Sequence, residues 1–291
     1  MITFSPGRSR PGVFGTVGEL TVSAKRTALV TGAAGDIGFE VAKRLHRQGY
    51  NLILTDVNRE GLERVTVLLP GSRHVVINLA DREALSAWTT EIRDDGNHLE
   101  VAFINAGVIV PGNVLDLNES QIDLQMEVNL RSALMLIKAC AHNMVTHGSG
   151  HIVSTVSIGG ILALKGSATY AATKFGLRGF MTGLRDELAA LNVHVSGLYP
   201  AGVDTQMLRY EALNNGSPLN FVNTPQTVSA VADAFEQALK TKRLEIHVPY
   251  LDGLFARLLA FFPGALQTIY PLLEYLGERG RKNYLERHDL I

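Results

Sequence analysis

The chain has 291 residues, a formal net charge of −1, and 46% hydrophobic against 19% charged residues. This composition is typical of a globular protein with a sizeable apolar core, and the length allows one large or two modest domains. The balanced charge provides no basic field for a nucleic acid. No apolar run reaches the roughly 20 residues that a membrane-spanning helix needs, so the sequence indicates a soluble protein.

The single cysteine, Cys140, lies in the predicted helical run ALMLIKACAHNM. One cysteine cannot form a disulfide within the chain, which favours a reducing, cytoplasmic setting, and we expect Cys140 to be a small buried residue. The nine histidines and the acidic residues show no metal-ligand spacing, so no metal site is predicted. Residues 1–24 are rich in Gly, Pro and Ser and lack the apolar stretch of a signal peptide. We interpret them as a flexible arm, with packing on a partner subunit as the alternative.

From Lys25 onward, short apolar runs alternate with longer helical patterns. Strands are predicted at 27–32, 51–56, 74–79, 101–107, 151–157, 193–200 and 244–249, and helices at 39–49, 59–69, 82–95, 119–144, 169–192 and 224–241. This alternation predicts an α/β fold with a doubly wound parallel sheet of the Rossmann type. We expect a single domain over 25–250, preceded by the arm 1–24 and followed by a C-terminal helical extension over 251–291.

Two segments beyond the sixth predicted strand have less regular patterns. Residues 205–224, with NNGSP at their centre, are interpreted as a loop that lies over the site as a lid. The next helix is predicted to start with Thr224 as its N-cap and Pro225 in its first position. The hydrophobic tail LFARLLAFFPGALQTIYPLLEYL is interrupted by Pro263 and Pro271. Three placements stay open for this tail: a roof over the pocket, a subunit contact, and peripheral contact with a membrane surface. Core or subunit packing is favoured.

A glycine-rich loop connects the first predicted strand to its helix. TALVTGAAGDIGFEVAKRL places Gly32, Gly35 and Gly38 there, in the context that a pyrophosphate-binding turn needs. Asp56 closes the second strand, where a carboxylate accepts hydrogen bonds from ribose hydroxyls and repels a 2′-phosphate. Since no Arg or Lys lies inside the loop, the sequence favours NAD over NADP, although Arg59 follows closely. A plain tight turn and a strand-end turn residue are the structural alternatives.

Tyr170 and Lys174 stand one helical turn apart in the run SATYAATKFGLRGF, so their side chains emerge on one helix face. A free tyrosine has a pKa of about 10, and an adjacent ammonium favours the phenolate. Among eight tyrosines, only Tyr170 has a lysine four residues later. A Tyr/Lys pair is also common on solvated helix faces, so its meaning depends on the rest of the site.

Together these motifs resemble the short-chain dehydrogenase/reductase family, from about Lys25 to Pro249. The resemblance makes TGAAGDIG (31–38) the cofactor loop and YPAGVDT the cofactor-closing segment after the sixth strand. It implies that Ser157 is the catalytic serine, that Asn129 helps hold a water relay, and that Tyr170 and Lys174 form the YxxxK pair. The cofactor-binding residues that it implies are Gly32, Gly35, Asp36, Ile37, Gly38, Asp56, Asn78, Leu79, Asn105, Ala106, Gly107, Tyr170, Lys174, Pro200, Val203 and Thr205.

The chain departs from the family pattern at three positions. Asp36 occupies the middle glycine position of the commonest loop, TGxxxGxG, and a carboxylate is unfavourable near a pyrophosphate unless it points away or caps the helix. Asn78 stands where the family often has an aspartate, and its amide oxygen can still accept a hydrogen bond. Ala201 stands where a glycine is usual. None of these removes a group that hydride transfer needs.

The resemblance implies reversible hydride transfer between a nicotinamide cofactor and an alcohol or carbonyl. Tyr170 would act as acid/base, Lys174 would lower its pKa and bond the nicotinamide ribose, and Ser157 would stabilise charge on the substrate oxygen. The expected pocket segments, 108–110, 158–164 and 205–224, are mostly aliphatic, which favours a lipophilic secondary alcohol or ketone. The family commonly forms dimers or tetramers through helices that lie here at 119–147 and 169–192, so a homodimer or homotetramer is expected.

Two alternatives stay open at this point. One is an NADP-dependent acyl-chain ketone reductase, against which Asp56 speaks. The other is a dinucleotide-binding sensor without catalysis, which need not retain the set of Ser157, Tyr170 and Lys174.

Overall fold

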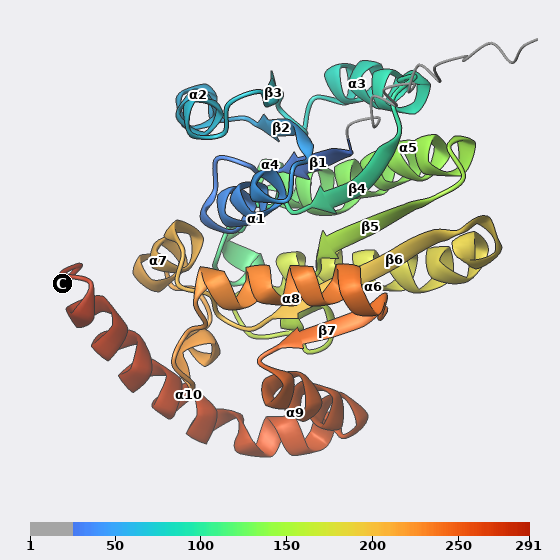
Figure 1. Ribbon diagram of the computed structural model, residues 1–291. Helices are drawn as coiled ribbons and strands as arrows, with labels where there is room; N and C mark the ends of the chain where they lie inside the picture. Colours follow the sequence, from blue (N-terminus) through green and yellow to red (C-terminus); the bar gives the residue numbers. More distant parts are fainter. Residues whose placement is uncertain (1–25) are drawn as a thin grey trace, which may run out of the picture.

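A sheet of seven parallel strands runs through the centre of the computed structural model, which describes residues 26–291 (Figure 1). The strand order is β3-β2-β1-β4-β5-β6-β7, and every neighbouring pair is parallel. The strands are β1 Thr27–Thr31, β2 Asn51–Asp56, β3 Arg73–Val76, β4 Leu99–Ile104, β5 Gly150–Thr155, β6 Val193–Pro200 and β7 Glu245–Val248. The predicted doubly wound sheet is therefore confirmed. The arm predicted for residues 1–24 lies outside the described residues.

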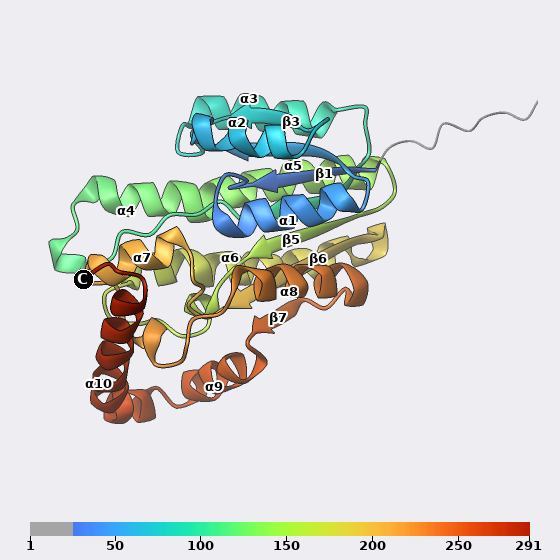
Figure 2. The same ribbon diagram turned by 60° about the vertical axis from the view of Figure 1, so that its left-hand side comes forward.

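Helices cover both faces of this sheet (Figures 1 and 2). One layer contains α1 Asp36–Arg47, α2 Arg59–Leu68 and α8 Val228–Thr241, and the other contains α3 Arg82–Asp94, α5 Ser132–Thr146 and α6 Ala168–Leu188. The remaining helices are α4 Glu119–Gln125, α7 Gln206–Leu213, α9 Tyr250–Phe261 and α10 Pro263–Arg287. A π-helical turn, Met126–Arg131, joins α4 to α5, and 3-10 turns occur at Val114–Asp116, Ile158–Gly160, Ala189–Leu191 and Pro218–Phe221.

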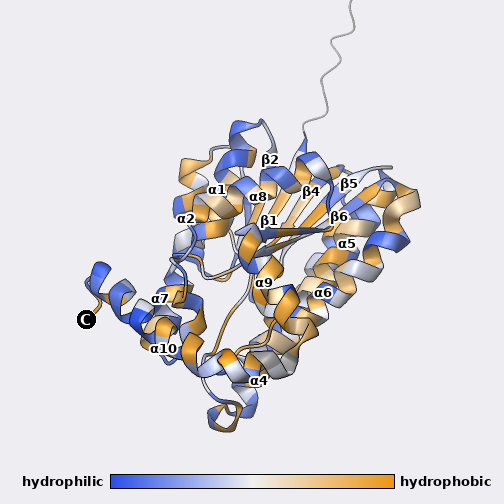
Figure 3. Ribbon diagram, turned by 90° about the horizontal axis from the view of Figure 1, so that it is seen from below, coloured by the Kyte–Doolittle hydropathy of each residue, from blue (hydrophilic) through white to orange (hydrophobic). Residues whose placement is uncertain are grey.

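The sheet separates two apolar cores, because successive side chains of a strand point to opposite faces. In β1, Leu29 faces the α3, α5 and α6 layer together with Trp88, while the adjacent Val30 faces the α1, α2 and α8 layer. In the second core the rings of Phe103 and Phe235 meet edge to face, with their centroids 4.9 Å apart. Figure 3 shows the apolar strands enclosed between the helical layers. Burial on both faces explains why the strands are nearly continuous hydrophobic runs in the sequence.

The segment predicted as a loop, 205–224, contains α7 and the 3-10 turn Pro218–Phe221, so the loop prediction is wrong. Thr205 caps α7, because its Oγ1 accepts a hydrogen bond from the backbone N–H of Leu208 at 3.3 Å. The helix packs against distant chain: Leu208 and Phe221 share a small core with Tyr284 of α10. Such tertiary packing stabilises a helix whose own sequence carries little periodic signal.

The predicted start of α8 is also wrong. The helix begins at Val228, and its N-cap is Thr227, whose Oγ1 accepts a hydrogen bond from Ala230 N at 3.1 Å. Residues 224–226 are instead held beside the end of β6. Gln226 N donates to Gly202 O at 2.7 Å, and Gln226 O accepts from Asp204 N at 2.9 Å. This backbone pairing fixes the segment in an extended form before the helix can start.

In the C-terminal extension α9 follows β7, and α10 then runs back along the edge of the molecule towards α7 (Figure 2). The expected break at Pro263 is confirmed, since α9 ends at Phe261, but α10 continues through Pro271. Near the end of α10, Tyr284 Oη donates to Asp204 Oδ1 at 2.6 Å. None of the helices in the described part of the chain has the length and apolar character to cross a bilayer. Contact of the exposed side of α9 and α10 with a membrane surface stays a prediction.

Candidate active site

A cavity of about 490 Å³ lies at the carboxyl ends of β1, β4, β5 and β6, where the strand order reverses between β1 and β4. Segments that are far apart in the sequence meet there, including the glycine loop, α6, α7 and α9. Most of the predicted site residues line it: Gly32, Gly35, Asp36, Ile37, Asp56, Asn105, Ala106, Gly107, Ser157, Tyr170, Lys174, Pro200, Val203 and Thr205. Four do not, namely Gly38, Asn78, Leu79 and Asn129.

The glycine loop has the shape that a pyrophosphate needs. Gly32 has a φ of +66°, which an L side chain rarely adopts, and it turns the chain out of β1. A Cβ on Gly38 would lie 2.0 Å from the carbonyl oxygen of Gly32, so only glycine lets α1 begin this close to the strand. Gly35 precedes the first residue of α1, and the N-terminus of this helix lies at the cavity. Free backbone N–H groups there suit a negatively charged ligand.

Asp36, the main departure from the family loop, forms a hydrogen bond with α7. Its Oδ2 accepts a hydrogen bond at 2.8 Å from the backbone N–H of Gln206, the first residue of α7. The carboxylate also lies in the first turn of α1, where a negative charge is favourable. Asp36 therefore connects the loop to the lid helix, which gives a physical reason for a carboxylate at this position.

The Asp56 carboxylate lies at the cavity wall, at the end of β2. Its Oδ2 accepts from Ala34 N at 3.0 Å, and its Oδ1 accepts from Asn58 N at 2.9 Å. These two bonds fix the carboxylate beside the glycine loop. Arg59, the cation that follows Asp56 closely in the sequence, is exposed and does not line the cavity.

The turn after β4 is held by two threonines. Thr31 Oγ1 accepts hydrogen bonds from Asn105 N at 2.9 Å and from Ala106 N at 3.0 Å. Thr155 Oγ1 donates to Asn105 Oδ1 at 2.9 Å, and the Thr155 carbonyl accepts from Lys174 Nζ at 2.9 Å. A continuous set of hydrogen bonds thus runs from β1 through β4 and β5 to α6.

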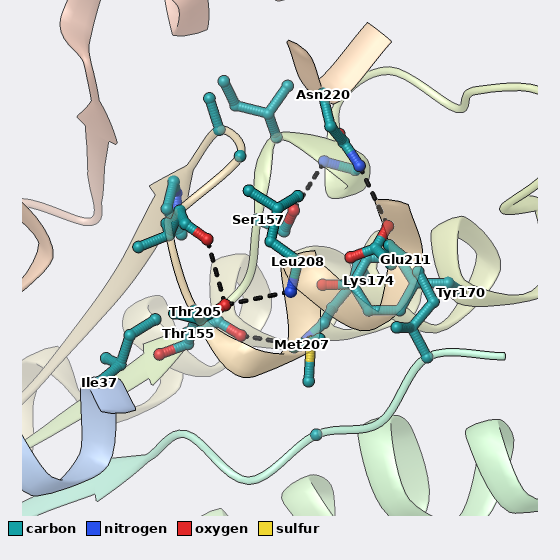
Figure 4. A pocket seen from close by; sticks show the side chains of 18 of the residues that line it. Ile37, Thr155, Ser157, Tyr170, Lys174, Thr205, Met207, Leu208, Glu211 and Asn220 are labelled. Atoms are coloured by element: carbon teal, nitrogen blue, oxygen red, sulfur yellow. Dashed lines mark hydrogen bonds between the residues drawn. The ribbon is translucent and has the colours of Figure 1, made fainter. Parts of the chain in front are cut away.

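Ser157 follows β5 with a φ of 114°, in a backbone region that L residues rarely occupy. Such a conformation costs about 1–3 kcal/mol and is most often found at functional sites. Its Oγ accepts a hydrogen bond from Gly159 N at 3.0 Å, which leaves the hydroxyl proton free to donate. Ser157 and Tyr170 both line the cavity, and both side chains lie beside Gly159 (Figure 4).

Tyr170 and Lys174 lie together on α6, with Lys174 Nζ 5.5 Å from the centre of the Tyr170 ring. Burial raises the pKa of Tyr170, the charge of Glu211 adds to this, and the Ser157 hydroxyl acts in the opposite direction. Burial also lowers the pKa of Lys174 to about 8. We expected Lys174 to bring down the pKa of Tyr170, but in the protein alone desolvation and Glu211 prevail, since an apolar surrounding disfavours every charged form.

The remaining predicted residues have structural contacts that the sequence does not reveal. Asn129 lies in the π-helical turn, and its side-chain amide forms two hydrogen bonds with the backbone of Val108, in the segment that follows β4. Oδ1 accepts from Val108 N at 2.7 Å, and Nδ2 donates to Val108 O at 2.8 Å. Its water-relay role stays a prediction. Asn78 is exposed, and its Oδ1 accepts from Ala80 N at 3.0 Å; the adjacent Leu79 is buried.

The expected pocket segment 205–224 lines the cavity, but its individual residues were not named from the sequence, and residues of the tail were missed. The polar residues of this segment include Glu211 and Asn220, and Asn220 Nδ2 donates to Glu211 Oε2 at 3.0 Å. Phe255, Leu259 and Leu273 of α9 and α10 are apolar members of the wall. For these tail residues the only signal in the sequence was the apolar character of the tail, for which a roof over the pocket was one of three open placements.

Comparison with known proteins identifies the family. The model of the short chain dehydrogenase family matches residues 26–215, more than half of the chain. Nodulation protein G of Rhizobium meliloti is 32% identical over 184 residues, which cover 62% of this chain and 75% of that protein. An uncharacterized oxidoreductase of Staphylococcus epidermidis is 29% identical over 184 residues, covering 63% and 80% of the two chains.

Solved structures agree on the fold. A short-chain dehydrogenase from Sphingobium yanoikuyae in complex with NADPH superposes with a TM-score of 0.72 at 24% identity, over 84% of this chain and 95% of that one. A bulky-bulky ketone specific alcohol dehydrogenase from Comamonas testosteroni gives a TM-score of 0.71 at 24% identity over the same shares. With the glycine loop, Ser157, Tyr170 and Lys174 on one cavity, the chain belongs to the short-chain dehydrogenase family and is one of its oxidoreductases.

Proposed function

We propose that this protein transfers hydride between NAD(H) and a lipophilic secondary alcohol or its ketone, with Tyr170 as the acid/base. The observation that carries the proposal is that Ser157, Tyr170 and Lys174 line the same cavity as the glycine loop. A positive-φ turn and the N-terminus of α1 suit a pyrophosphate at one part of this cavity. The three side chains suit a reacting carbon–oxygen bond at the other part.

Each of the three side chains has a chemical task in this proposal. A bound nicotinamide would supply the hydride acceptor or donor. Ser157 keeps its proton and donates a hydrogen bond to the substrate oxygen, which stabilises the charge that develops there. Tyr170 takes the hydroxyl proton during oxidation and returns it during reduction. Lys174, which Thr155 O holds 2.9 Å away, keeps a positive charge beside the phenol and supports the phenolate.

NAD is favoured over NADP because Asp56 provides a negative charge at the ribose end of the cavity. A 2′-phosphate would meet this carboxylate, and burying two like charges together is unfavourable. The rival NADP-dependent acyl-chain reductase needs a cation at this wall. Arg59 is the nearest candidate in the sequence, and its side chain lies outside the lining.

The lipophilic substrate class follows from the lining near the reacting groups. The aliphatic side chains of the lining include Ile109, Ile158, Leu162, Leu208, Leu219 and Leu259. Contact with them removes apolar substrate surface from water, at about 25 cal/mol per Å². The rival sensor function leaves the positions of Ser157, Tyr170 and Lys174 unexplained, because a binding protein needs no proton donor at the reacting end.

An absorbance screen at the nicotinamide band tests this function directly. Long-chain, aromatic and steroid secondary alcohols are offered with NAD and with NADP, and the matching ketones with NADH and NADPH. We expect turnover with at least one alcohol and a preference for NAD. Binding of the cofactor without turnover of any substrate would favour the sensor, and a preference for NADPH would favour the reductase.

We also propose a homodimer or homotetramer that uses the helices around 119–147 and 169–192. Support comes from large apolar side chains that α5 and α6 leave exposed, Met135 at 36% and Phe175 at 42%. Light scattering of the purified protein gives the mass. A monomer would contradict this assembly, and Phe175→Glu should shift an oligomer toward smaller species.

A further inference from the structure

Glu211 is a buried acid in the cavity that the proposed reaction does not use. It lies on α7 with 8% of its surface exposed, and it lines the cavity together with Tyr170. Figure 4 shows its carboxyl group directed toward the Tyr170 ring. One oxygen, Oε2, is held by Asn220 Nδ2 at 3.0 Å. A carboxylate has room for several more hydrogen bonds.

No cation of the described chain pairs with Glu211. Lys174 lies on α6, and its Nζ donates a hydrogen bond to the Thr155 carbonyl. Arg209, on the same helix as Glu211, pairs with Asp204 at 3.0 Å. The groups that face the carboxyl are therefore the phenol of Tyr170 and the amide of Asn220. Burying a carboxylate without a counter-charge is costly, so a ligand group is the natural partner.

The charge of Glu211 works against the neighbouring acid/base. Burial raises the pKa of Glu211 to about 7, so an appreciable fraction is ionised near neutrality. Its negative charge in turn raises the pKa of Tyr170 and disfavours the phenolate that alcohol oxidation needs. A neutral hydroxyl on the substrate would satisfy a lone pair of Glu211 and leave this repulsion in place. An ammonium group would satisfy the lone pair and cancel the charge.

We propose that Glu211 determines specificity by binding an ammonium group that the substrate carries close to its reacting carbon. This inference rests on the proposed function and narrows its substrate class to lipophilic amino alcohols and amino ketones. The apolar lining contributed by Leu208, Leu219 and Leu259 accommodates the rest of the molecule. Asn220 positions the carboxyl group, because it holds Oε2 and leaves the other oxygen for the ligand.

A matched pair of alcohols tests the inference. 1-Amino-2-octanol and 3-nonanol share the hexyl chain and the carbinol, and they differ by an ammonium or a methyl group on the adjacent carbon. Calorimetry measures their binding to the full-length wild type and to Glu211→Gln, with NADH present to prevent oxidation. At about pH 8, where Glu211 is ionised, wild type should bind the amino alcohol at least about tenfold more tightly than the variant does. Glu63→Gln, on the exposed side of α2, is the matched control and should behave as wild type.

The outcomes separate this inference from the proposed function. Equal affinity of wild type and Glu211→Gln for the amino alcohol, including no measurable binding to either, overturns the role of Glu211. Turnover of 3-nonanol without any preference for the amino alcohol leaves the proposed dehydrogenase intact and removes only the specificity. Tight, Glu211-dependent binding of the amino alcohol supports the recognition site, and absent turnover of both alcohols with NAD would then count against the proposed reaction alone.

Discussion

The Asp36 carboxylate accepts a hydrogen bond from the backbone N–H of Gln206 at 2.8 Å, although the two residues stand 170 positions apart. Asp36 belongs to the first turn of α1 and Gln206 to the first turn of α7. The first N–H groups of a helix have no partner within it, so this carboxylate satisfies one of them. As a result, the cofactor loop and the lid share a charged hydrogen bond, and a change in either is transmitted to the other.

Replacing Asp36 separates its charge from its hydrogen bond. Asp36→Asn keeps an oxygen acceptor for Gln206 and removes the negative charge near the pyrophosphate site, so we expect NADH to bind about two- to tenfold more tightly. Asp36→Ala removes the acceptor, and the loosened lid should raise the KM for the alcohol by about three- to tenfold. Nicotinamide fluorescence and steady-state kinetics measure these effects. An unchanged KM in Asp36→Ala would show that the bond does not hold the lid.

Removing the Tyr170 hydroxyl should abolish catalysis and spare cofactor binding. Tyr170→Phe keeps the ring that contacts the cavity but has no proton to exchange, so kcat should fall at least about 100-fold. The affinity for NADH, followed by fluorescence, should stay within about twofold, since the glycine loop is unchanged in this variant. Tyr275→Phe, on the exposed side of α10, is the control and should retain full activity. Near-normal rates in Tyr170→Phe would rule out the proposed mechanism.

The buried Glu211 should make the protein less stable as the pH rises. Folding raises its pKa from the ordinary value of 4.5 to about 7, so the folded state binds more protons than the unfolded state between these values. The contribution to stability is therefore fully present below about pH 4.5 and is lost as the pH rises through about 7. Glu211→Gln removes this titration, and from about pH 5 to pH 8 it should gain on the order of 2–4 kcal/mol relative to wild type.

Urea unfolding of both proteins at the two pH values measures this difference. His151, whose pKa burial lowers from 6.5 to about 3, gains its proton in this range only in the unfolded state, but it is present in both proteins and cancels in the comparison. Lys174 has the opposite sign and contributes from about pH 8 upward, so the window ends there. Parallel pH profiles for wild type and Glu211→Gln would show that the acid is not desolvated in solution.

The sheet and α6, which carries Tyr170 and Lys174, could be predicted because their information is local. Buried parallel strands are continuous apolar runs, and the one-turn spacing of Tyr170 and Lys174 fixes them on a single face of α6. The glycine loop is equally local, since the strand before it and the helix after it are both strong patterns. For such elements the sequence pattern and the tertiary structure agree.

The position of the lid at the site was predicted, but its helical structure could not be, because the stability of α7 comes from distant residues. α7 is short, and its apolar residues Leu208 and Ala212 pack on Tyr284 and Leu285 of α10, which no local pattern connects to it. The same reasoning applies to Glu211. In the sequence, a single glutamate on a short helix is expected to be solvated, and only the tertiary structure shows that Glu211 is buried. The start of α8 was misplaced for a related reason, because pairing of Gln226 with Gly202 delays the helix.

The contact between α10 and the lid should be sensitive to one added methyl group. A Cβ on Gly280 would lie 2.0 Å from the carbonyl oxygen of Phe221, so Gly280→Ala must displace α10 or the lid. We expect a loss of about 1–3 kcal/mol in the free energy of unfolding and a higher KM for the alcohol. Gly264→Ala, on the same helix with nothing within 4 Å of the added Cβ, is the control and should be neutral or slightly stabilising. Equal stability of both variants would mean that α10 does not pack tightly on the lid.

Cofactor preference should change when Asp56 loses its charge. Asp56→Asn keeps one oxygen acceptor for the backbone N–H of Ala34 or Asn58, so the fold of the loop should survive. Without the carboxylate, a 2′-phosphate no longer meets a like charge, and the affinity for NADPH should rise at least about tenfold, while that for NADH falls a few-fold. Fluorescence titrations with both cofactors give the ratio, and Asp94→Asn at the exposed end of α3 is the control. Beside the glycine loop, the described lining contains two acids, Asp56 and Asp36, and Asp36 already accepts a hydrogen bond from the lid. Selection against the 2′-phosphate therefore depends on Asp56. A wild type that already prefers NADPH, or a ratio unchanged in Asp56→Asn, would mean that the charge at the end of β2 does not select the cofactor.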